Sequence, residues 1–302
     1  MISVEDVRAA EERIKGRVRR TPLLEAGPST FFKLEYAQHA GSFKTRGMFN
    51  QILAAGPIPP AGVVVASGGN AGLAAAYAAG RLGVPAEVFV PETAPPVKVA
   101  KLGKLGARVT QVGAEYAEAA AASAVHAEQT GALFLHAYDD PGMVAGNGTL
   151  GLELLDDLGF DTVLVAVGGG GLAAGVAAAL ADRPVNVVGV EPENCPTLRG
   201  ALDAGAPVDV PVGGVAADSL GARRIGLLPY QIMVLTGMAS LLVDDPAIVE
   251  ARRRLWDDYR IVVEHGTAAA YAALTSGAYR PADGERVVVL LCGANTNPGD
   301  LA

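Results

Sequence analysis

Short apolar runs alternate with longer alanine-rich segments over most of the chain, and this alternation constrains the fold more than any other feature. Runs of about four to six residues rich in Val, Ile and Leu predict strands, and the segments between them predict helices. The expected strands are residues 31–34, 63–66, 86–90, 107–112, 132–135, 162–167, 185–190 and 286–291, and the helices between them include 71–82, 97–105, 115–129, 143–157 and 172–181. This order predicts right-handed βαβ units, and therefore an α/β fold with parallel sheet covered by helices on both faces.

Composition excludes several classes of protein. The chain has 302 residues and a formal net charge of −8, which leaves no basic excess for neutralising the phosphates of a nucleic acid. Half of the residues are hydrophobic, which excludes intrinsic disorder. Cys195 and Cys292 lie 97 positions apart and the four histidines are scattered, so neither a disulfide framework nor a structural zinc site is expected.

One apolar stretch imitates a membrane span. Residues 162–181 are 20 uncharged positions, which is long enough to cross a bilayer. Four consecutive glycines, 168–171, stand in its middle, so we interpret the stretch as a strand, a glycine turn and a buried helix. The N-terminus lacks the basic start and apolar core of a secretory signal. We therefore expect a cytoplasmic protein without a membrane partner.

The search for a site starts at the strand ends, because ligands of parallel α/β sheets bind beyond the carboxyl ends of the strands. The segment 41–47, GSFKTRG, places Lys44 at an expected helix start with Arg46 nearby. Both the helix N-terminus and Arg46 disfavour a further positive charge there, which predicts a lowered pKa or a covalently bound amine. An ordinary surface lysine at the head of a helix is the alternative interpretation.

Two glycine-rich turns join an expected strand to an expected helix. Residues 67–72, SGGNAG, would expose backbone N–H groups suited to a carboxylate or phosphate, although a plain turn capped by Asn70 explains them as well. The glycines 168–171 are more than a tight turn needs and predict a phosphate cradle. No GK[ST] follows them, so they are not a Walker loop. Glu191, about 20 positions further on, keeps a dinucleotide fold as an alternative.

Cys292 directly follows the last expected strand and is either a small buried residue or a polar group of the same site. Together, these segments would supply an amine, a phosphate-binding turn without a metal, a second turn suited to an anion and a polar group at the end of a strand. A phosphorylated cofactor that condenses with a lysine needs these parts, and pyridoxal phosphate is the obvious candidate.

The order of the motifs is similar to that of a known family. The segments GSFKTRG, SGGNAGLAAAYAAGRLGVPAEVFVP, GGGGL, VGVEPE and LCGANTN resemble the serine/threonine dehydratases among the fold-type II pyridoxal-phosphate enzymes, from about residue 21 to 297. The resemblance implies two open parallel-sheet domains of the tryptophan synthase β type. Residues 1–40 and 143–302 would form the large cofactor-binding domain, 41–142 the small mobile domain, and two chains a homodimer.

The resemblance also implies a role for individual residues. Lys44 would bind the cofactor covalently and later act as the catalytic base at Cα. The cofactor-binding residues would be Phe43, Lys44, Asn70, Gly168, Gly169, Gly170, Gly171, Leu172 and Cys292, and the substrate carboxylate would be bound by Ser67, Gly68, Gly69 and Asn70. Cys292 would face the pyridine nitrogen of the cofactor. Residues 216–221, AADSLG, would cover the cofactor, with Ser219 near its ring.

The activity implied is that of an ammonia-lyase, which eliminates water from L-serine or L-threonine and releases pyruvate or 2-oxobutyrate with ammonia. A 3-hydroxyaspartate dehydratase, for which Arg223 and Arg224 are candidate cations, and a serine racemase are the alternatives. Serine racemases carry a serine at the position of Gly68, so racemisation is disfavoured here. The family often binds a monovalent or divalent cation, for which Glu191 is a candidate ligand; helix capping is the other interpretation of this carboxylate.

Overall fold

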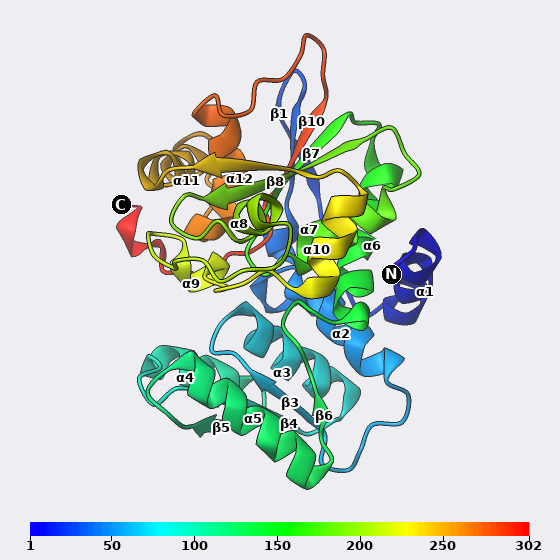
Figure 1. Cartoon of the computed structure of the whole chain (residues 1–302), viewed down its shortest axis with the longest axis vertical. Helices are drawn as coiled ribbons and strands as arrows, with labels where there is room; N and C mark the ends of the chain where they lie inside the picture. The colour runs from blue at the N-terminus through cyan, green and yellow to red at the C-terminus, as the bar shows by residue number, and fades with distance from the viewer. Residues whose placement is uncertain (302) are drawn as a thin grey trace.

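A computed structural model describes residues 1–301 and contains two sheets, one above the other in Figure 1. The larger sheet has the strand order β1-β2-β10-β7-β8-β9, and the smaller one β5-β4-β3-β6. All neighbouring strands are parallel except the pair β1 and β2. The strands are β1 (Leu23–Gly27), β2 (Thr30–Lys33), β3 (Val63–Ala66), β4 (Ala86–Val90), β5 (Arg108–Gln111), β6 (Leu133–Phe134), β7 (Thr162–Ala166), β8 (Asn186–Pro192), β9 (Ala239–Val243) and β10 (Val287–Leu290).

Helices separate most of these strands along the chain. They are α1 (Val4–Ile14), α2 (Lys44–Ala54), α3 (Asn70–Leu82), α4 (Pro96–Lys104), α5 (Tyr116–Thr130), α6 (Pro141–Asp157), α7 (Gly171–Ala179), α8 (Thr197–Ala204), α9 (Ala217–Leu220), α10 (Leu227–Leu235), α11 (Asp245–Tyr259) and α12 (His265–Thr275). The α/β prediction is confirmed. The strands β1 and β9 were not expected, and β1 adds one antiparallel pair to an otherwise parallel sheet.

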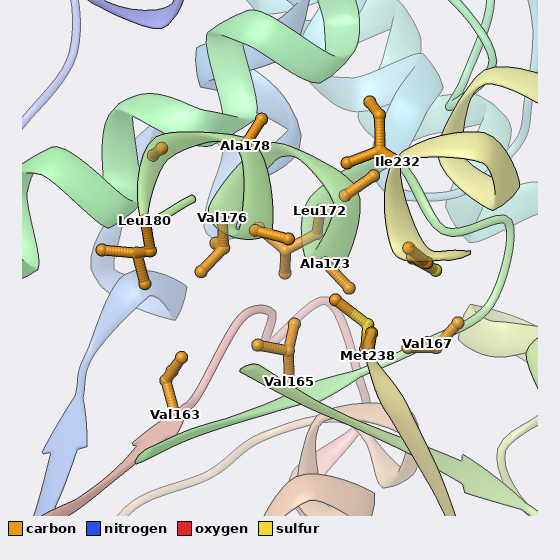
Figure 2. Packing of buried hydrophobic residues seen from close by; sticks show 14 of the residues in the cluster. Val163, Val165, Val167, Leu172, Ala173, Val176, Ala178, Leu180, Ile232 and Met238 are labelled. Atoms are coloured by element: carbon orange, nitrogen blue, oxygen red, sulfur yellow. The ribbon is translucent and has the colours of Figure 1, made fainter. Parts of the chain in front are cut away.

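Both faces of the larger sheet are apolar because alternate residues of a strand point to opposite faces. Val163 and Val165 of β7 pack beneath α7, where they meet Leu172 and Val176 (Figure 2). Leu164, between them, points to the opposite face and packs with residues of α11 and α12. The same alternation divides β3 between α3 on one face and α5 on the other. Helices therefore cover both faces of each sheet, as the continuous apolar strands predict.

The uncharged stretch 162–181 folds as predicted, into β7, a glycine turn and α7. None of the helices within residues 1–301 is both long and apolar enough to cross a membrane.

A buried ion network joins α2 to the larger sheet. Arg46 of α2 donates to Glu35 at 2.7 Å and to Glu153 of α6 at 2.8 Å, and its side chain is 2% exposed. Lys33 at the end of β2 donates to Glu153 at 2.7 Å and to Asp157 at 2.6 Å. Each buried cation therefore faces two carboxylates, as buried charges require. The network fixes the orientation of α2, whose first residue is Lys44.

Candidate active site

A cavity lies where the carboxyl ends of β3, β7 and β10 meet the first turns of α2, α3, α7 and α12. Its empty volume is about 520 Å³, part of it open to solvent. It is lined by Phe43, Lys44, Asn70, Tyr138, Ala166, Gly168, Gly169, Gly170, Gly171, Leu172, Ser219, Leu220, Glu264, Gly266, Thr267 and Cys292. The predicted cofactor-binding residues thus come together in one place, although they are drawn from distant parts of the chain.

Lys44 contributes the amine of the cavity. It is the first residue of α2, and its Nζ donates to the carbonyl oxygen of Ala137 and lies 4.9 Å from the centre of the Phe43 ring. Desolvation lowers the pKa of Lys44 to about 8, while the charge of an ionised Cys292 would raise it. An amine with this pKa is partly neutral near physiological pH, and only the neutral form is a nucleophile.

The cause that the sequence suggested for this low pKa is wrong in part. Arg46 was expected to repel a protonated Lys44, but its guanidinium is directed into the ion network with Glu35 and Glu153. Its charge is neutralised there, and burial is the main cause of the lowered pKa of Lys44. The expected place at a helix N-terminus is confirmed.

The four glycines between β7 and α7 form a backbone cradle. A Cβ at Gly169 would come within 2.6 Å of three ring atoms of Tyr138, and one at Gly171 would lie 2.7 Å from the carbonyl oxygen of Tyr138. Gly170 has φ +90°, which favours glycine. Within residues 1–301, no N–H group from Gly168 to Leu172 donates to a protein acceptor. These free N–H groups and the α7 dipole favour an anion.

Cys292 lies two residues after the end of β10 and is held as a neutral thiol. Burial raises its pKa to about 12, and a hydrogen bond with Thr267 only partly offsets this. The Thr267 Oγ1 lies 3.4 Å from the Cys292 Sγ and also accepts from the Gly293 N–H at 2.9 Å. The Phe43 N–H donates to the Cys292 carbonyl at 3.0 Å, so Cys292 is fixed beside the start of α2.

Asn70, the first residue of α3, enters the cavity from the smaller sheet. Its Nδ2 donates to the Oε1 and Oε2 of Glu264 at 3.0 and 2.9 Å, and its Oδ1 accepts from the Asn295 Nδ2 at 2.6 Å. Glu264 precedes α12 and is 4% exposed. Desolvation raises the pKa of Glu264, with a further contribution from Asp218.

The three remaining substrate-binding candidates do not line this cavity. Ser67, Gly68 and Gly69 form the turn between β3 and α3, next to Asn70. The Gly69 N–H donates to the Ser67 Oγ at 3.2 Å, and α3 has no side-chain cap. The first N–H groups of α3 are therefore available to an anion at the edge of the cavity.

Glu191 does not line the cavity and is fully buried. It accepts hydrogen bonds from the N–H groups of Leu198 and Arg199 at 2.6 and 2.9 Å and from the Ser240 hydroxyl at 2.7 Å. These contacts are those of a carboxylate that caps α8. The described residues, 1–301, hold no group of three or more His, Cys, Asp or Glu side chains arranged for a metal. A cation at Glu191 stays a prediction.

Sequence reasoning missed three lining residues that have polar side chains. Tyr138 follows the two-residue strand β6, so its place at the carboxyl edge of the smaller sheet was the available signal. Glu264 and Thr267 flank the start of α12, and no local pattern connects them with Asn70 or Cys292. Their contacts span 194 and 25 positions of the sequence, respectively.

The cavity suits a phosphorylated aldehyde cofactor, since it combines an amine of low pKa, a glycine cradle and a neutral thiol. A family model described as "Pyridoxal-phosphate dependent enzyme" matches residues 14–293. The chain belongs to this family. The assignment confirms the predicted fold type II and the predicted cofactor, pyridoxal phosphate.

Individual members of the family agree with this assignment. The chain is 36% identical to an L-threonine ammonia-lyase of Geobacter sulfurreducens, over 94% of this chain and 73% of the relative. It is 37% identical to a phenylserine dehydratase of Ralstonia pickettii, over 96% of this chain and 92% of the relative. Among solved structures, the T.th. threonine deaminase has a TM-score of 0.90 at 35% identity, covering 98% of this chain and 99% of that one. Maize serine racemase has a TM-score of 0.92 at 31% identity, covering 99% and 95%.

Proposed function

We propose that the protein is a pyridoxal-phosphate-dependent ammonia-lyase that eliminates water from L-serine and/or L-threonine. The products are pyruvate or 2-oxobutyrate together with ammonia. The observation that carries the proposal is the cavity itself, in which the Lys44 amine, the cradle 168–171 and the neutral Cys292 thiol line one space. Relatives named threonine ammonia-lyase or threonine dehydratase support the reaction class.

Lys44 and the glycine cradle would hold the cofactor. Lys44 would bind it covalently, and the N–H groups from Gly168 to Leu172 would bind its phosphate at the N-terminus of α7. When bound, the cofactor supplies a conjugated ring that withdraws electrons from Cα of the substrate. The Lys44 Nζ would also be the base that removes the Cα proton of the substrate. Its pKa of about 8 suits this task, because a base is most effective when its pKa lies near the working pH.

Cys292 would select elimination over competing reactions. With a pKa of about 12, its thiol stays neutral and offers no negative charge to hold a proton on the pyridine nitrogen. A ring without that proton would be a weaker electron sink, which would favour loss of the β-hydroxyl over racemisation or transamination. The hydrogen bond network of Thr267 keeps the thiol in place.

The turn before α3 would bind the substrate carboxylate. The free N–H groups at the start of α3 and the hydroxyl of Ser67 would form this anion site, in the turn of Ser67, Gly68 and Gly69. Phe43 would pack against the cofactor ring, and Asn70 would donate to its hydroxyl group. The resemblance to the family implies these roles, and the places of Phe43 and Asn70 in the cavity lining support theirs.

We favour elimination over both alternatives on the residues present at the site. A 3-hydroxyaspartate dehydratase needs a cation for the second carboxylate, but Lys44 is the one cation among the lining residues of the described chain. Arg224 pairs instead with Asp209 at 2.7 Å, and both side chains are exposed. A serine racemase needs an acid at the position of Gly68, which has no side chain. Elimination is therefore the reaction that these residues support.

We further propose that residues 41–142 act as the small mobile domain and that two chains form a cytoplasmic homodimer. Asn70 reaches the cavity from the smaller sheet, so movement of that sheet would open and close the site. The helix α10 exposes Leu227, Val234 and Leu235, which are 56%, 47% and 62% exposed and suit a contact between protomers.

The activity is tested with protein reconstituted with pyridoxal phosphate and a panel of L- and D-hydroxy amino acids. We expect equal amounts of 2-oxo acid and ammonia from L-serine or L-threonine, and none from the Lys44→Ala variant. Protein that binds the cofactor but releases ammonia from neither substrate would overturn the proposal. Phenylserine and 3-hydroxyaspartate in the same panel show which substituent on Cβ the enzyme accepts.

A further inference from the structure

Glu264 is a buried carboxylate without a cation. Its side chain lines the cavity, is 4% exposed and forms no salt bridge within residues 1–301. Its oxygens accept from the Asn70 Nδ2 and from the Asn295 N–H, the latter at 2.9 Å. Burying a carboxylate with amide donors alone costs free energy, so its presence at a functional site needs an explanation.

The residues around Glu264 fit it closely. The Glu264 N–H donates to the Gly293 carbonyl at 3.1 Å, and a Cβ at Gly293 would lie 3.0 Å from the Glu264 Oε2. The Asn295 Nδ2 donates to the Ala40 carbonyl at 2.8 Å as well as to Asn70. Ala40 has φ +56°, an uncommon conformation for a residue with a side chain. The segment after β10 is thus shaped to present Glu264 and Asn295 to Asn70.

These contacts determine which way the Asn70 amide faces. An ionised carboxylate only accepts hydrogen bonds, so the Nδ2 of Asn70 must turn to Glu264 and its Oδ1 to the donor Nδ2 of Asn295. Asn70 belongs to α3 on the smaller sheet, whereas Glu264 and Asn295 belong to the part built on the larger sheet. The network therefore connects the two sheets across the cavity.

We propose that Glu264 is a positioning residue, whose ionised carboxylate fixes the Asn70 amide in one orientation and ties the start of α3 to the start of α12. The role at the cofactor rests on the proposed function, since Asn70 is the group that would touch the cofactor. Glu264 acts through Asn70 and takes no part in proton transfer to the substrate. If Glu264 is protonated, one of its oxygens can donate a hydrogen bond. Either end of the Asn70 amide can then face Glu264, so the orientation of Asn70 is no longer fixed.

The test is a double-mutant cycle with Glu264→Gln and Asn70→Ala. In urea unfolding of the apoprotein, we expect the two changes to be coupled by about fivefold or more in the unfolding equilibrium constant. In the holoenzyme, we expect Glu264→Gln to lower kcat by about tenfold or more. The double variant should be no slower than Asn70→Ala alone, within about twofold, because Asn70 is the route by which Glu264 acts.

Two further readouts separate positioning from a purely structural role. Glu264→Gln should shift the visible absorption band of the bound cofactor in the same direction as Asn70→Ala. In the wild type, we expect kcat to fall at low pH as Glu264 becomes protonated. In Glu264→Gln this fall should be absent. The charged or titratable groups that act on Glu264 are Asp218, Lys98 and Cys292, and they are unchanged in the variant.

Matched variants control for general damage. Asp244 is the N-cap of α11 and accepts from the Ala247 N–H at 2.8 Å, outside the cavity. Asp244→Asn makes the same change of carboxylate to amide and should leave kcat, the pH profile and the band unchanged. If Glu264→Gln does not fold, Glu264→Asp keeps the charge but withdraws it from Asn70, and it should show the same coupling.

Additive effects of Glu264 and Asn70 in both the apoprotein and the holoenzyme would overturn the inference. A wild-type protein that binds no cofactor and releases no ammonia would overturn the proposed function instead. In that case the unfolding cycle of the apoprotein still decides whether Glu264 holds Asn70.

Discussion

A single methyl group at Gly169 should weaken cofactor binding strongly. In Gly169→Ala the new Cβ would come within 2.6 Å of three ring atoms of Tyr138, whereas ordinary van der Waals contact begins at 3.4 Å. The ring cannot retreat easily, because the Tyr138 carbonyl and Cα already lie against Gly171. The glycine cradle or Tyr138 must then move by roughly 1 Å, which a close-packed interior resists.

The size of the effect follows from the cost of overpacking. One extra methyl in a filled site costs about 1–3 kcal/mol. If the overpacked cradle can relax in the apoprotein but not around the bound phosphate, the whole cost falls on the bound state. Binding of pyridoxal phosphate is then weakened by roughly 5- to 150-fold. Titration of the apoprotein with the cofactor, followed by its visible absorption, measures this change.

Two variants make this prediction specific. Tyr138→Ala combined with Gly169→Ala removes the clash and should restore much of the affinity lost in Gly169→Ala. Gly103→Ala adds the same methyl to α4, where nothing lies within 4 Å, and should raise stability by about 0.5–1 kcal/mol without affecting binding. Wild-type affinity in Gly169→Ala would refute the argument that the cradle is filled to its limit.

Three more perturbations follow from the same contacts. Arg46→Met leaves Glu35 without its buried cation and should lower the free energy of unfolding by about 3–5 kcal/mol, measured by urea denaturation; a loss below about 1 kcal/mol would contradict the network. The pKa of Lys44 is lowered from 10.5 to about 8, so between these values the unfolded chain binds a proton that the folded apoprotein lacks, and apoprotein stability should rise with pH. Lys44→Met should remove that rise, and an unchanged slope would argue against the low pKa. Gly68→Ser should fold normally, since its Cβ would lie 3.4 Å from the Val90 Cγ1, and should form some D-serine from L-serine, detected by chiral chromatography.

Local sequence patterns predicted most of the fold. The β-branched strands buried on both faces and the glycines that end helices are short-range signals, so the order of strands and helices from residue 63 to 190 was predictable. The strand β9 was missed because its pairing with β8 is a tertiary contact, which the short run ASLLV does not reveal. The antiparallel strand β1 was missed for the same kind of reason.

The site residues also fall into those that local sequence patterns predict and those that depend on tertiary contacts. Lys44, the glycines 168–171 and Cys292 stand at strand or helix ends that the sequence marks, and the structure brings them together. Glu264 was not predictable, because its partner Asn70 is 194 positions away and neither residue has a local pattern that names the other. The predicted effect of Arg46 on the pKa of Lys44 was wrong, because the two residues are close in sequence but the sequence does not show that Glu35 and Glu153 neutralise Arg46. The domain boundaries at 41 and 142 stay a prediction.

The most direct test is chemical trapping of the bond between protein and cofactor. Protein loaded with pyridoxal phosphate is reduced with borohydride, digested and mapped by mass spectrometry. We predict one modified peptide, with the added mass on Lys44 at the start of α2. Label on another lysine, or cofactor that is bound but leaves no label, would contradict the mechanism derived from this cavity.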